Sequence, residues 1–293
     1  MGKKMTVIKV PATSANLGPG FDSLGIALSM YLTLTVGSKC DEWVVEHDLG
    51  ADIPTDEENM IIKTALGLAP NLEPHKVRVE SKIPLARGLG SSSTAIVAGL
   101  ALANHLGKLG IGKDELVQKA TELEGHPDNV APAILGDFVA ATYVNGHVTS
   151  VKGNFPKLSF LAYIPDYELA TSQSREALPE QLAFKDAVIA GSVGNALVAS
   201  ILTGNLAEIG PLMEADRYHE QARLKLVPHL EILRKLGHEV GALATYLSGA
   251  GPTVMVVIDQ SKVADFIKEA QALGLTGRFE QLEVERQGLV VSE

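Results

Sequence analysis

Apolar residues at every second position predict a strand early in the chain. Between residues 28 and 36, the apolar Leu32, Leu34 and Val36 alternate with tyrosine and threonine, a pattern typical of a half-buried strand. The short segment 43–46 follows closely. We expect it to be the hairpin partner of that strand.

A second hairpin is predicted near the middle of the chain. Segments 138–144 and 147–151 flank Asn145 and Gly146, a strong signal for a two-residue turn. We expect this hairpin to close the first half of the chain and an apolar strand at 158–164 to open the second half. Further strands are expected at 5–10, 76–80, 240–247, 253–258 and 281–285.

Longer apolar segments predict helices. The run 95–107 is rich in Ala, Ile, Val and Leu and is expected to be a buried helix. The stretch 187–204 is also expected to be a buried helix, because glycine, serine and asparagine interrupt it and a membrane span needs about 20 predominantly apolar residues. Other helices are expected at 59–69, 113–124, 175–178, 185–203, 206–213, 229–236 and 262–273.

Strands and helices are mixed throughout, and neither a repeat nor a flexible linker separates them. This order indicates an α+β two-layer protein with two tightly joined halves and a boundary near residues 150–158. We therefore divide the chain into residues 1–154 and 155–293.

Composition and charge exclude several classes of function. The 293 residues are 46% hydrophobic and 20% charged, which is typical of a globular protein, and the net charge of −10 argues against a nucleic-acid partner. No segment indicates a membrane partner, and residues 1–4 lead into a strand without a secretory signal. The single cysteine, Cys40, excludes an internal disulfide and fits a cytoplasmic location.

A stretch rich in glycine and serine lies between a predicted strand and a predicted buried helix. Gly88 and Gly90 allow a left-handed backbone or the close approach of a ligand. Ser91, Ser92 and Ser93 follow at the helix start, where unpaired amides and the helix dipole favour an anion such as phosphate. The alternative is an ordinary glycine turn with a serine N-cap.

Polar residues interrupt apolar structure at further places. Asn16 and Asp22 lie in an early loop rich in glycine and proline, where they are expected to be turn formers if the loop is considered alone. Residues 248–252 form a glycine turn between two predicted strands. Arg175 and Arg223 could bind a carboxylate or phosphate bidentately, although a solvated surface position is the commoner alternative.

Acidic residues gather at the end of the helix predicted at 113–124. Glu122 and Glu124 lie at the helix C-terminus, where the dipole disfavours negative charge, and His126 and Asp128 follow. A cation such as Mg²⁺, which prefers oxygen ligands, would make this placement favourable. A zinc site is the alternative, but one histidine without a nearby cysteine falls short of the usual zinc ligands.

Together these motifs resemble the GHMP kinase family over nearly the whole chain. They are PATSANLGPGFD at 11–22, PLARGLGSSST at 84–94, HPDNVAP at 126–132, the segment 171–175, His219-Glu220 before Arg223, and LSGAGPT at 247–253. The first and third are similar to the versions found in family members that phosphorylate homoserine.

The resemblance implies an N-terminal α/β half containing a left-handed β-α-β crossover and a C-terminal ferredoxin-like half. It implies ATP-dependent phosphorylation of the L-homoserine hydroxyl in threonine biosynthesis, with Mg²⁺, in a cleft between the halves. A homodimer is common in the family. The alternatives are another small-molecule kinase of the family, for instance one acting on mevalonate, and a non-catalytic nucleotide-binding sensor.

The resemblance also implies nucleotide and metal ligands. The nucleotide-binding residues would be Pro84, Leu85, Ala86, Arg87, Gly88, Leu89, Gly90, Ser91, Ser92, Ser93 and Thr94. Ser92 and Glu124 would hold Mg²⁺. The short spacing between Glu124 and Asp128 leaves Glu122 as an alternative metal ligand.

Substrate and catalytic roles follow from the same resemblance. Arg175 and Arg223 would bind the homoserine carboxylate with Thr171 nearby, and Asp22 and Asn16 would face its amino group and hydroxyl. Asn129 would bind substrate, and the implied catalytic residues are Asn129, Asp128 and Arg175. Asn129 stands where several relatives carry an aspartate proposed as general base. An amide cannot take a proton, but phosphoryl transfer can proceed by positioning and electrostatics.

Overall fold

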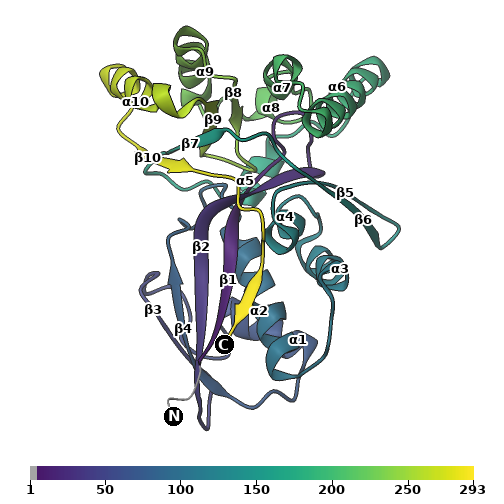
Figure 1. The fold of residues 1–293 in the computed structure, drawn as a ribbon, viewed down its shortest axis with the longest axis vertical. Helices are drawn as coiled ribbons and strands as arrows, with labels where there is room; N and C mark the ends of the chain where they lie inside the picture. The colour runs from purple at the N-terminus through teal and green to yellow at the C-terminus, as the bar shows by residue number, and fades with distance from the viewer. Residues whose placement is uncertain (1–4) are drawn as a thin grey trace.

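The computed structural model describes residues 5–293, and residues 1–4 lie outside the described part of the chain. The N-terminal half is built on a seven-stranded sheet (Figure 1). Its strands are β1 (Thr6–Ala15), β2 (Leu24–Lys39), β3 (Val44–His47), β4 (His75–Ser81), β5 (Phe138–Val144), β6 (His147–Gly153) and β11 (Val290–Ser292). The strand order is β11-β1-β2-β4-β3, and β5 pairs with both β2 and β6. Asn145 and Gly146, both at positive φ, join β5 to β6 and confirm the predicted hairpin.

Four helices pack beside this sheet (Figure 1). They are α1 (Met60–Leu68), α2 (Ser91–Leu106), α3 (Lys113–Glu124) and α4 (Val130–Leu135). Most of α2 is buried, as the run of Ala, Val and Leu predicts, and this helix contacts β1. The buried position of α2 fixes its N-terminus relative to the end of β1.

The partner of β3 differs from the prediction. β3 pairs in parallel with β4, with Val45 opposite Val77, and is not the hairpin partner of β2. The chain between these two parallel strands contains α1, which makes a β-α-β unit. The alternation of apolar residues sets which side of a strand is buried, but it does not choose the neighbouring strand.

The C-terminal half contains a four-stranded antiparallel sheet (Figure 1). Its strands are β7 (Ser159–Ile164), β8 (Ala244–Leu247), β9 (Val254–Ile258) and β10 (Arg278–Leu282), in the order β10-β7-β9-β8. The helices of this half are α5 (Thr171–Glu176), α6 (Phe184–Thr203), α7 (Leu206–Met213), α8 (Glu220–Arg223), α9 (His229–Val240) and α10 (Val263–Ala272), with a 3₁₀ turn at Gln260–Lys262. Strands β7, β8, β9 and β10 with intervening helices follow the β-α-β-β-α-β order of a ferredoxin-like fold.

One hydrophobic core crosses from one half to the other. It includes Ile26 and Phe138 of the first sheet together with Phe160 and Tyr246 of the second, all fully buried. The C-terminal strand β11 also returns to the first sheet and pairs with β1. The halves are therefore held as one packed body, and the last residues of the chain belong structurally with the first.

Helix α6 departs from the prediction of a buried helix. Its buried residues are Ala190, Leu197, Ser200 and Ile201, whereas Phe184 is 86% exposed. By length and composition this helix is apolar enough to cross a membrane, but a single helix of this kind is weak evidence for a membrane span. The apolar composition of α6 was therefore a poor guide to its burial.

Two element boundaries also differ from prediction. The loop expected at 11–22 starts only at Asn16, because β1 continues through a register shift between Pro11 and Ala12. A strand tolerates proline at such an irregularity. In the C-terminal half, Val240 still belongs to α9, and Gly241 ends that helix in the left-handed conformation. The strand predicted from residue 240 therefore starts at Ala244.

Candidate active site

A single pocket brings together motifs from both halves of the chain. Its lining comes from the β1–β2 loop, the loop before α2, the end of α3, α5, α8 and the turn before β9. The lining residues are Asn16, Phe21, Asp22, Ala86, Arg87, Gly88, Gly90, Ser91, Ser92, Ser93, Glu124, His126, Asp128, Asn129, Leu169, Thr171, Arg175, Arg223, Gly249, Ala250 and Gly251. Most of the site residues predicted from the sequence therefore share one cavity.

Hydrogen bonds lock three sequence-distant loops around this pocket. The hydroxyl of Ser248 donates to the carbonyl of Gly88 at 2.6 Å, and Ser14 Oγ lies 2.8 Å from Ser248 Oγ. Asn16 Nδ2 donates to the carbonyl of Gly249 at 3.1 Å. The loops that carry the three motifs thus support one another directly.

The N-terminus of α2 presents unpaired amides to the pocket. Gly90 is the N-cap in the left-handed conformation and supplies no side-chain cap, and the amide of Thr94 is the first to bond back into the helix. Among residues 5–293, the amides of Ser91, Ser92 and Ser93 have no backbone partner. Three free amides at the positive end of a 16-residue helix form a favourable anion site.

Gly88 and Gly90 line the pocket and also pack closely against other parts of the protein. A Cβ on Gly88 would lie 2.4 Å from the carbonyl oxygen of Ser248, and one on Gly90 would lie 2.1 Å from Thr13 Oγ1. Both residues are at positive φ. Glycine is therefore required here by backbone conformation and by the packing of the motifs.

Glu124 contacts Ser93, and not Ser92 as its predicted metal partner. The hydroxyl of Ser93 donates to Glu124 Oε1 at 2.8 Å, whereas the hydroxyl of Ser92 faces the sulfur of Met60. Glu122 lies outside the pocket and accepts a hydrogen bond from Gln118. Glu124 thus lies in the pocket and Glu122 outside it, and the serine hydroxyl next to Glu124 is that of Ser93.

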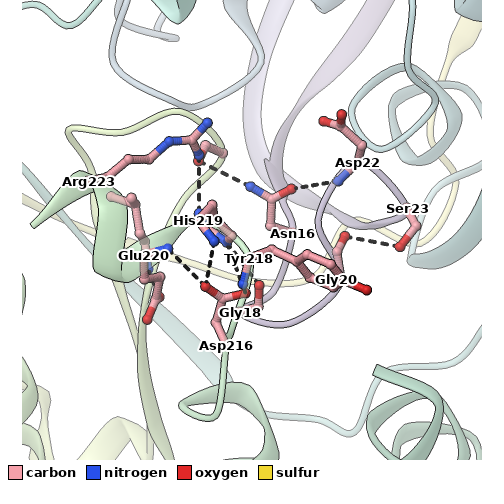
Figure 2. Close-up of polar contacts among 12 residues, drawn as sticks. Asn16, Gly18, Gly20, Asp22, Ser23, Asp216, Tyr218, His219, Glu220 and Arg223 are labelled. Carbon is pink, nitrogen blue, oxygen red and sulfur yellow. Dashed lines mark hydrogen bonds and ion pairs between the residues drawn. The ribbon is translucent and has the colours of Figure 1, made fainter. Parts of the chain in front are cut away.

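The side chain of Asn16 fixes the position of the Asp22 backbone. Its amide nitrogen is bonded to Gly249, and its Oδ1 accepts the backbone N–H of Asp22 at 3.1 Å (Figure 2). Asn16 is 2% exposed and adopts a positive φ of 72°, which asparagine tolerates better than most residues. The predicted contact of Asn16 with substrate competes with these structural bonds, so its main observed effect is to place Asp22.

Arg223 is held rigidly at the pocket wall. Its Nε donates to the carbonyl of Ser174 at 3.0 Å, and its Nη1 donates to the carbonyl of Gly249 at 3.1 Å. Nη1 also donates to His219 Nδ1 at 3.1 Å (Figure 2). Among residues 5–293, Nη2 has no hydrogen-bond partner. Burial, followed by the positive charge of Arg175, lowers the pKa of Arg223 to about 10. Arg223 is thus a partly desolvated side chain whose Nη2 is available to bind an anion.

His219 was not assigned a role of its own from the sequence, yet it sets the position of Arg223. Because arginine only donates, His219 Nδ1 accepts, and its Nε2 carries the hydrogen donated to the carbonyl of Gly18 at 2.9 Å. The side chain of Asp216 accepts the amides of His219 and Glu220 and so begins α8 (Figure 2). The histidine connects the early loop to the helix that carries Arg223.

Arg175 and Asp22 bind each other across the pocket. Arg175 Nη2 donates to Asp22 Oδ1 at 2.7 Å and Nη1 donates to Oδ2 at 3.1 Å. The hydrogen bond to Asp22, against the opposing effect of burial, raises the pKa of Arg175. The ring of Phe21, also missed from the sequence, lies 5.6 Å from the guanidinium of Arg175 and 5.5 Å from that of Arg223. An aromatic face next to both cations offsets part of their mutual repulsion.

Asp128 and Asn129 lie at the floor of the pocket. His126 Nδ1 is 2.5 Å from Asp128 Oδ1, and Asn129 Oδ1 accepts the hydroxyl of Thr13 at 2.8 Å. Burial alone would lower the pKa of His126, but the hydrogen bond to Asp128 and the nearby carboxylates outweigh burial and raise it. Asp128 is therefore already hydrogen-bonded to His126, which weakens its suitability as a proton acceptor.

The remaining predicted residues fall into three groups. Thr171 is the exposed first residue of α5 and lines the pocket. Arg87 also lines it, but its donors bond to the carbonyls of Leu85, Pro165 and Asp166, so it mainly anchors the loop. Of the other loop residues, Leu89 and Thr94 are buried, and neither they nor Pro84 and Leu85 line this pocket.

A second, apolar cavity of about 480 Å³ adjoins the α2 N-terminus. It shares Ala86, Ser91, Ser92, Leu169 and Thr171 with the first pocket. Its other walls include Leu49, Ile53, Pro54, Asn59, Met60, Ile61, Val79 and Ala95. This cavity was not predicted, because apolar residues that line a cavity have the same sequence pattern as residues that fill a core.

Comparison with known proteins identifies relatives over the whole chain. Residues 59–137 match the family described as GHMP kinases N terminal domain, and residues 197–274 match GHMP kinases C terminal. A homoserine kinase of Lactococcus lactis subsp. cremoris (strain SK11) is 48% identical over 291 residues, covering 98% of each chain. One from Enterococcus faecalis is 50% identical over 284 residues, covering 97% of this chain and 99% of the relative.

Solved structures with a similar fold include a homoserine kinase and a mevalonate kinase. The structure of a homoserine kinase from Listeria monocytogenes has a TM-score of 0.89 and 45% identity, covering 98% of this chain and 99% of that one. A mevalonate kinase from Methanococcus jannaschii has a TM-score of 0.74 at 17% identity, covering 97% of this chain and 99% of that chain. At that identity the second likeness concerns the fold alone.

Proposed function

This chain belongs to the GHMP kinase family, and we propose that it transfers the γ-phosphoryl group of ATP to the side-chain hydroxyl of L-homoserine. Its activity is that of a homoserine kinase, as in relatives about half identical over almost the full length. The product, O-phospho-L-homoserine, belongs to threonine biosynthesis. The observation that carries the proposal is one pocket in which the free amides of α2 face Asp22, Arg175 and Arg223.

The α2 N-terminus is the proposed phosphate site. The unpaired amides of Ser91, Ser92 and Ser93 can donate to phosphate oxygens, and the helix dipole favours their charge. The adjoining apolar cavity is large enough for the planar adenine ring and shares Ser91 and Ser92 with the phosphate site. A nucleotide can therefore extend from the apolar cavity to the amides.

The donor set at the end of α3 fits Mg²⁺. Glu124 contributes a carboxylate and Ser93 a hydroxyl, both oxygen ligands, beside the proposed phosphate site. A bound Mg²⁺ would neutralise charge on the β- and γ-phosphates. Because Glu124 is at the C-terminal end of α3, a cation there would also offset the unfavourable helix dipole.

The opposite wall has the charges that a zwitterionic amino acid needs. Arg223 directs an unpaired Nη2 and a desolvated positive charge toward a carboxylate, and Arg175 adds a second cation. Asp22 is the acceptor for the ammonium. Thr171 and Asn129 complete the wall beside the acceptor hydroxyl.

The transfer step forms a bond between the homoserine oxygen and the γ-phosphorus and breaks the bond from that phosphorus to the β,γ-bridging oxygen. Asn129 has no basic atom for the hydroxyl proton, and Asp128 is already bonded to His126. Phosphoryl transfer has a loose transition state with little need for a strong base. The chain's contribution is thus to align the hydroxyl and stabilise charge, and the proton can leave to solvent or to a phosphate oxygen.

The proposal is tested by ADP release with homoserine, with mevalonate and without an acceptor. We expect turnover with homoserine well above the rate without acceptor. Turnover with mevalonate but not with homoserine would identify another small-molecule kinase of the family. If no ADP is released with either acceptor, a nucleotide-binding sensor would be favoured. Phosphorus NMR of the product distinguishes phosphoryl transfer from ATP hydrolysis.

A cytoplasmic location and a homodimer are part of the proposal. The lone cysteine, Cys40, supports a reducing compartment. The dimer rests on the family resemblance, and light scattering of the purified chain tests it.

A further inference from the structure

The two groups that we assign to opposite ends of homoserine are bonded to each other in the structure. Arg175 and Asp22 form a bidentate pair with distances of 2.7 and 3.1 Å. The side chain of Asp22 has no other hydrogen-bond partner in the described chain. For its ammonium to take the paired oxygens of Asp22 and its carboxylate to take the paired nitrogens of Arg175, homoserine has to separate the pair.

The exposure of the pair allows this separation. The side chains of Arg175 and Asp22 are 38% and 34% exposed, and ion pairs with this degree of solvent contact are weakly held. Asp22 comes from the early loop of the first half and Arg175 from the short helix α5 of the second. A ligand that enters between them can replace one direct contact by two contacts of its own.

Whether Asp22 and Arg175 both keep a partner of opposite charge depends on the charges of the ligand. A zwitterion supplies an ammonium to Asp22 and a carboxylate to Arg175, so both charges remain paired. A hydroxy acid supplies only the carboxylate. When it takes Arg175, Asp22 is left without its partner in a cluster with His126 and Asp128, whose ligand atoms all lie within 4.8 Å of one another. Two carboxylates then share one imidazole, so at least one negative charge stays unpaired beside another.

We propose that the Asp22–Arg175 ion pair makes the site discriminate against acceptor alcohols that have a carboxylate but no ammonium. This inference rests on the proposed function and goes beyond it, because Asp22 acts in two ways. It binds the ammonium of the correct substrate, and it holds Arg175 away from a ligand that lacks an ammonium. The second effect predicts that removing the Asp22 charge improves binding of the wrong substrate.

The test compares homoserine with 4-hydroxybutanoate, which keeps its hydroxyl and carboxylate and lacks its ammonium. Both are measured by ADP release and by calorimetry in the unmodified protein and in Asp22→Asn. For homoserine we expect kcat/KM to fall about tenfold or more, as for loss of a hydrogen-bonded charge. For 4-hydroxybutanoate we expect the affinity to rise about two- to fivefold, the range set by an exposed ion pair.

A matched control distinguishes the effect of the ion pair on ligand affinity from the effect of the overall charge near the site. Glu176 is exposed, is adjacent to Arg175 in sequence and lies outside the pocket lining. Glu176→Gln removes one nearby carboxylate without touching the pair. We expect the ratio of homoserine to 4-hydroxybutanoate affinity to stay unchanged in this variant.

Each result has a defined meaning. If the affinity of Asp22→Asn for 4-hydroxybutanoate is unchanged or lower, the inference is overturned, and Asp22 is a simple ammonium contact. An equal rise in Glu176→Gln would also overturn it, because overall charge would then explain the effect. Failure of the unmodified protein to phosphorylate homoserine would instead defeat the proposed function.

Discussion

The hydroxyl of Ser93 donates a 2.8 Å hydrogen bond to the carboxylate of Glu124, which joins the first turn of α2 to the last residue of α3. Ser93 is buried and contributes an unpaired amide as well as this hydroxyl. The phosphate site and the proposed metal ligand are thus connected through a single residue. The effects of substitutions in the phosphate site and at Glu124 on ATP binding and on catalysis can therefore be compared directly.

Loss of the Glu124 charge is expected to disable catalysis without unfolding the protein. Glu124→Gln preserves size and an acceptor for Ser93, but it removes the negative charge that Mg²⁺ needs. We expect kcat to fall about a hundredfold, the effect typical of losing a group that stabilises transition-state charge. Steady-state kinetics at increasing Mg²⁺ concentrations measure this fall in kcat. Glu122→Gln is the control, and a larger loss in that variant would reverse the assignment.

The amide of Ser92 can be tested apart from its hydroxyl. Proline is tolerated in the first turn of a helix and lacks the N–H, so Ser92→Pro removes an amide proposed to face phosphate, although its ring also restricts the backbone of the preceding Ser91. We expect about a tenfold loss of ATP affinity by calorimetry, as for one hydrogen bond to a charged group. Ser92→Ala keeps the amide and should bind ATP normally. A strong defect in Ser92→Ala would restore Ser92 as metal ligand. Gly90 is a poorer test site, since a Cβ there would lie 2.1 Å from Thr13 Oγ1.

Arg223→Leu should weaken the use of homoserine and leave ATP affinity nearly unchanged. Removing a hydrogen-bonded cation is expected to lower kcat/KM for homoserine roughly ten- to a hundredfold. The same change deprives the carbonyls of Ser174 and Gly249 of a donor, so the free energy of unfolding should also decrease by about 1–3 kcal/mol. Urea denaturation reports this second effect. The exposed Lys225 supplies a control, Lys225→Leu, and an equal kinetic loss there would contradict a specific carboxylate contact.

Phe21 should matter through its aromatic face. Phe21→Leu keeps an apolar side chain but removes two cation–π contacts, each worth roughly 0.5–1 kcal/mol. Because both contacts already exist without substrate, their loss acts through the positions of the two arginines, and we expect KM for homoserine to rise by at most about five- to thirtyfold, with kcat less affected. Phe21→Tyr should preserve most of the wild-type KM. If the leucine and tyrosine variants behave alike, the two arginines do not depend on the ring.

His229 should make the fold less stable in acid. Burial lowers the pKa of His229 in the folded protein, although the hydrogen bond to the carbonyl of Pro252 acts in the opposite direction. The unfolded chain then binds more protons than the folded one below the ordinary pKa of about 6.5. This contribution to stability is present above about pH 6.5 and decreases as the pH falls toward the folded pKa, by at most about 1.4 kcal/mol per pH unit.

His229→Gln removes this titration and keeps a donor for Pro252. The free energy of unfolding in urea, measured at pH 7.5 and at pH 5.5, gives the contribution of His229. We expect the variant to lose less stability than the wild type over this interval. The same loss in both proteins would show that His229 does not titrate differently on folding.

Local chemistry determined much of this protein from the sequence alone. Asn145-Gly146 specified a hairpin because few other residue pairs adopt two positive φ angles cheaply. Gly90 and the serines after it specified a helix start, and the structure showed that no serine side chain caps it. Several separated motifs, each constrained in this local way, were enough to identify the family and its reaction.

Tertiary structure decided the relationships between residues. Neighbouring residues of an α-helix differ by about 100° in direction, so the change from Ser92 to Ser93 beside Glu124 could not be settled from spacing. The pair of Asp22 and Arg175 joins residues 153 positions apart, and its formation depends on how the two halves pack. Periodicity and turn chemistry are properties of short segments, whereas the distance between two charged groups is set by the whole shared core.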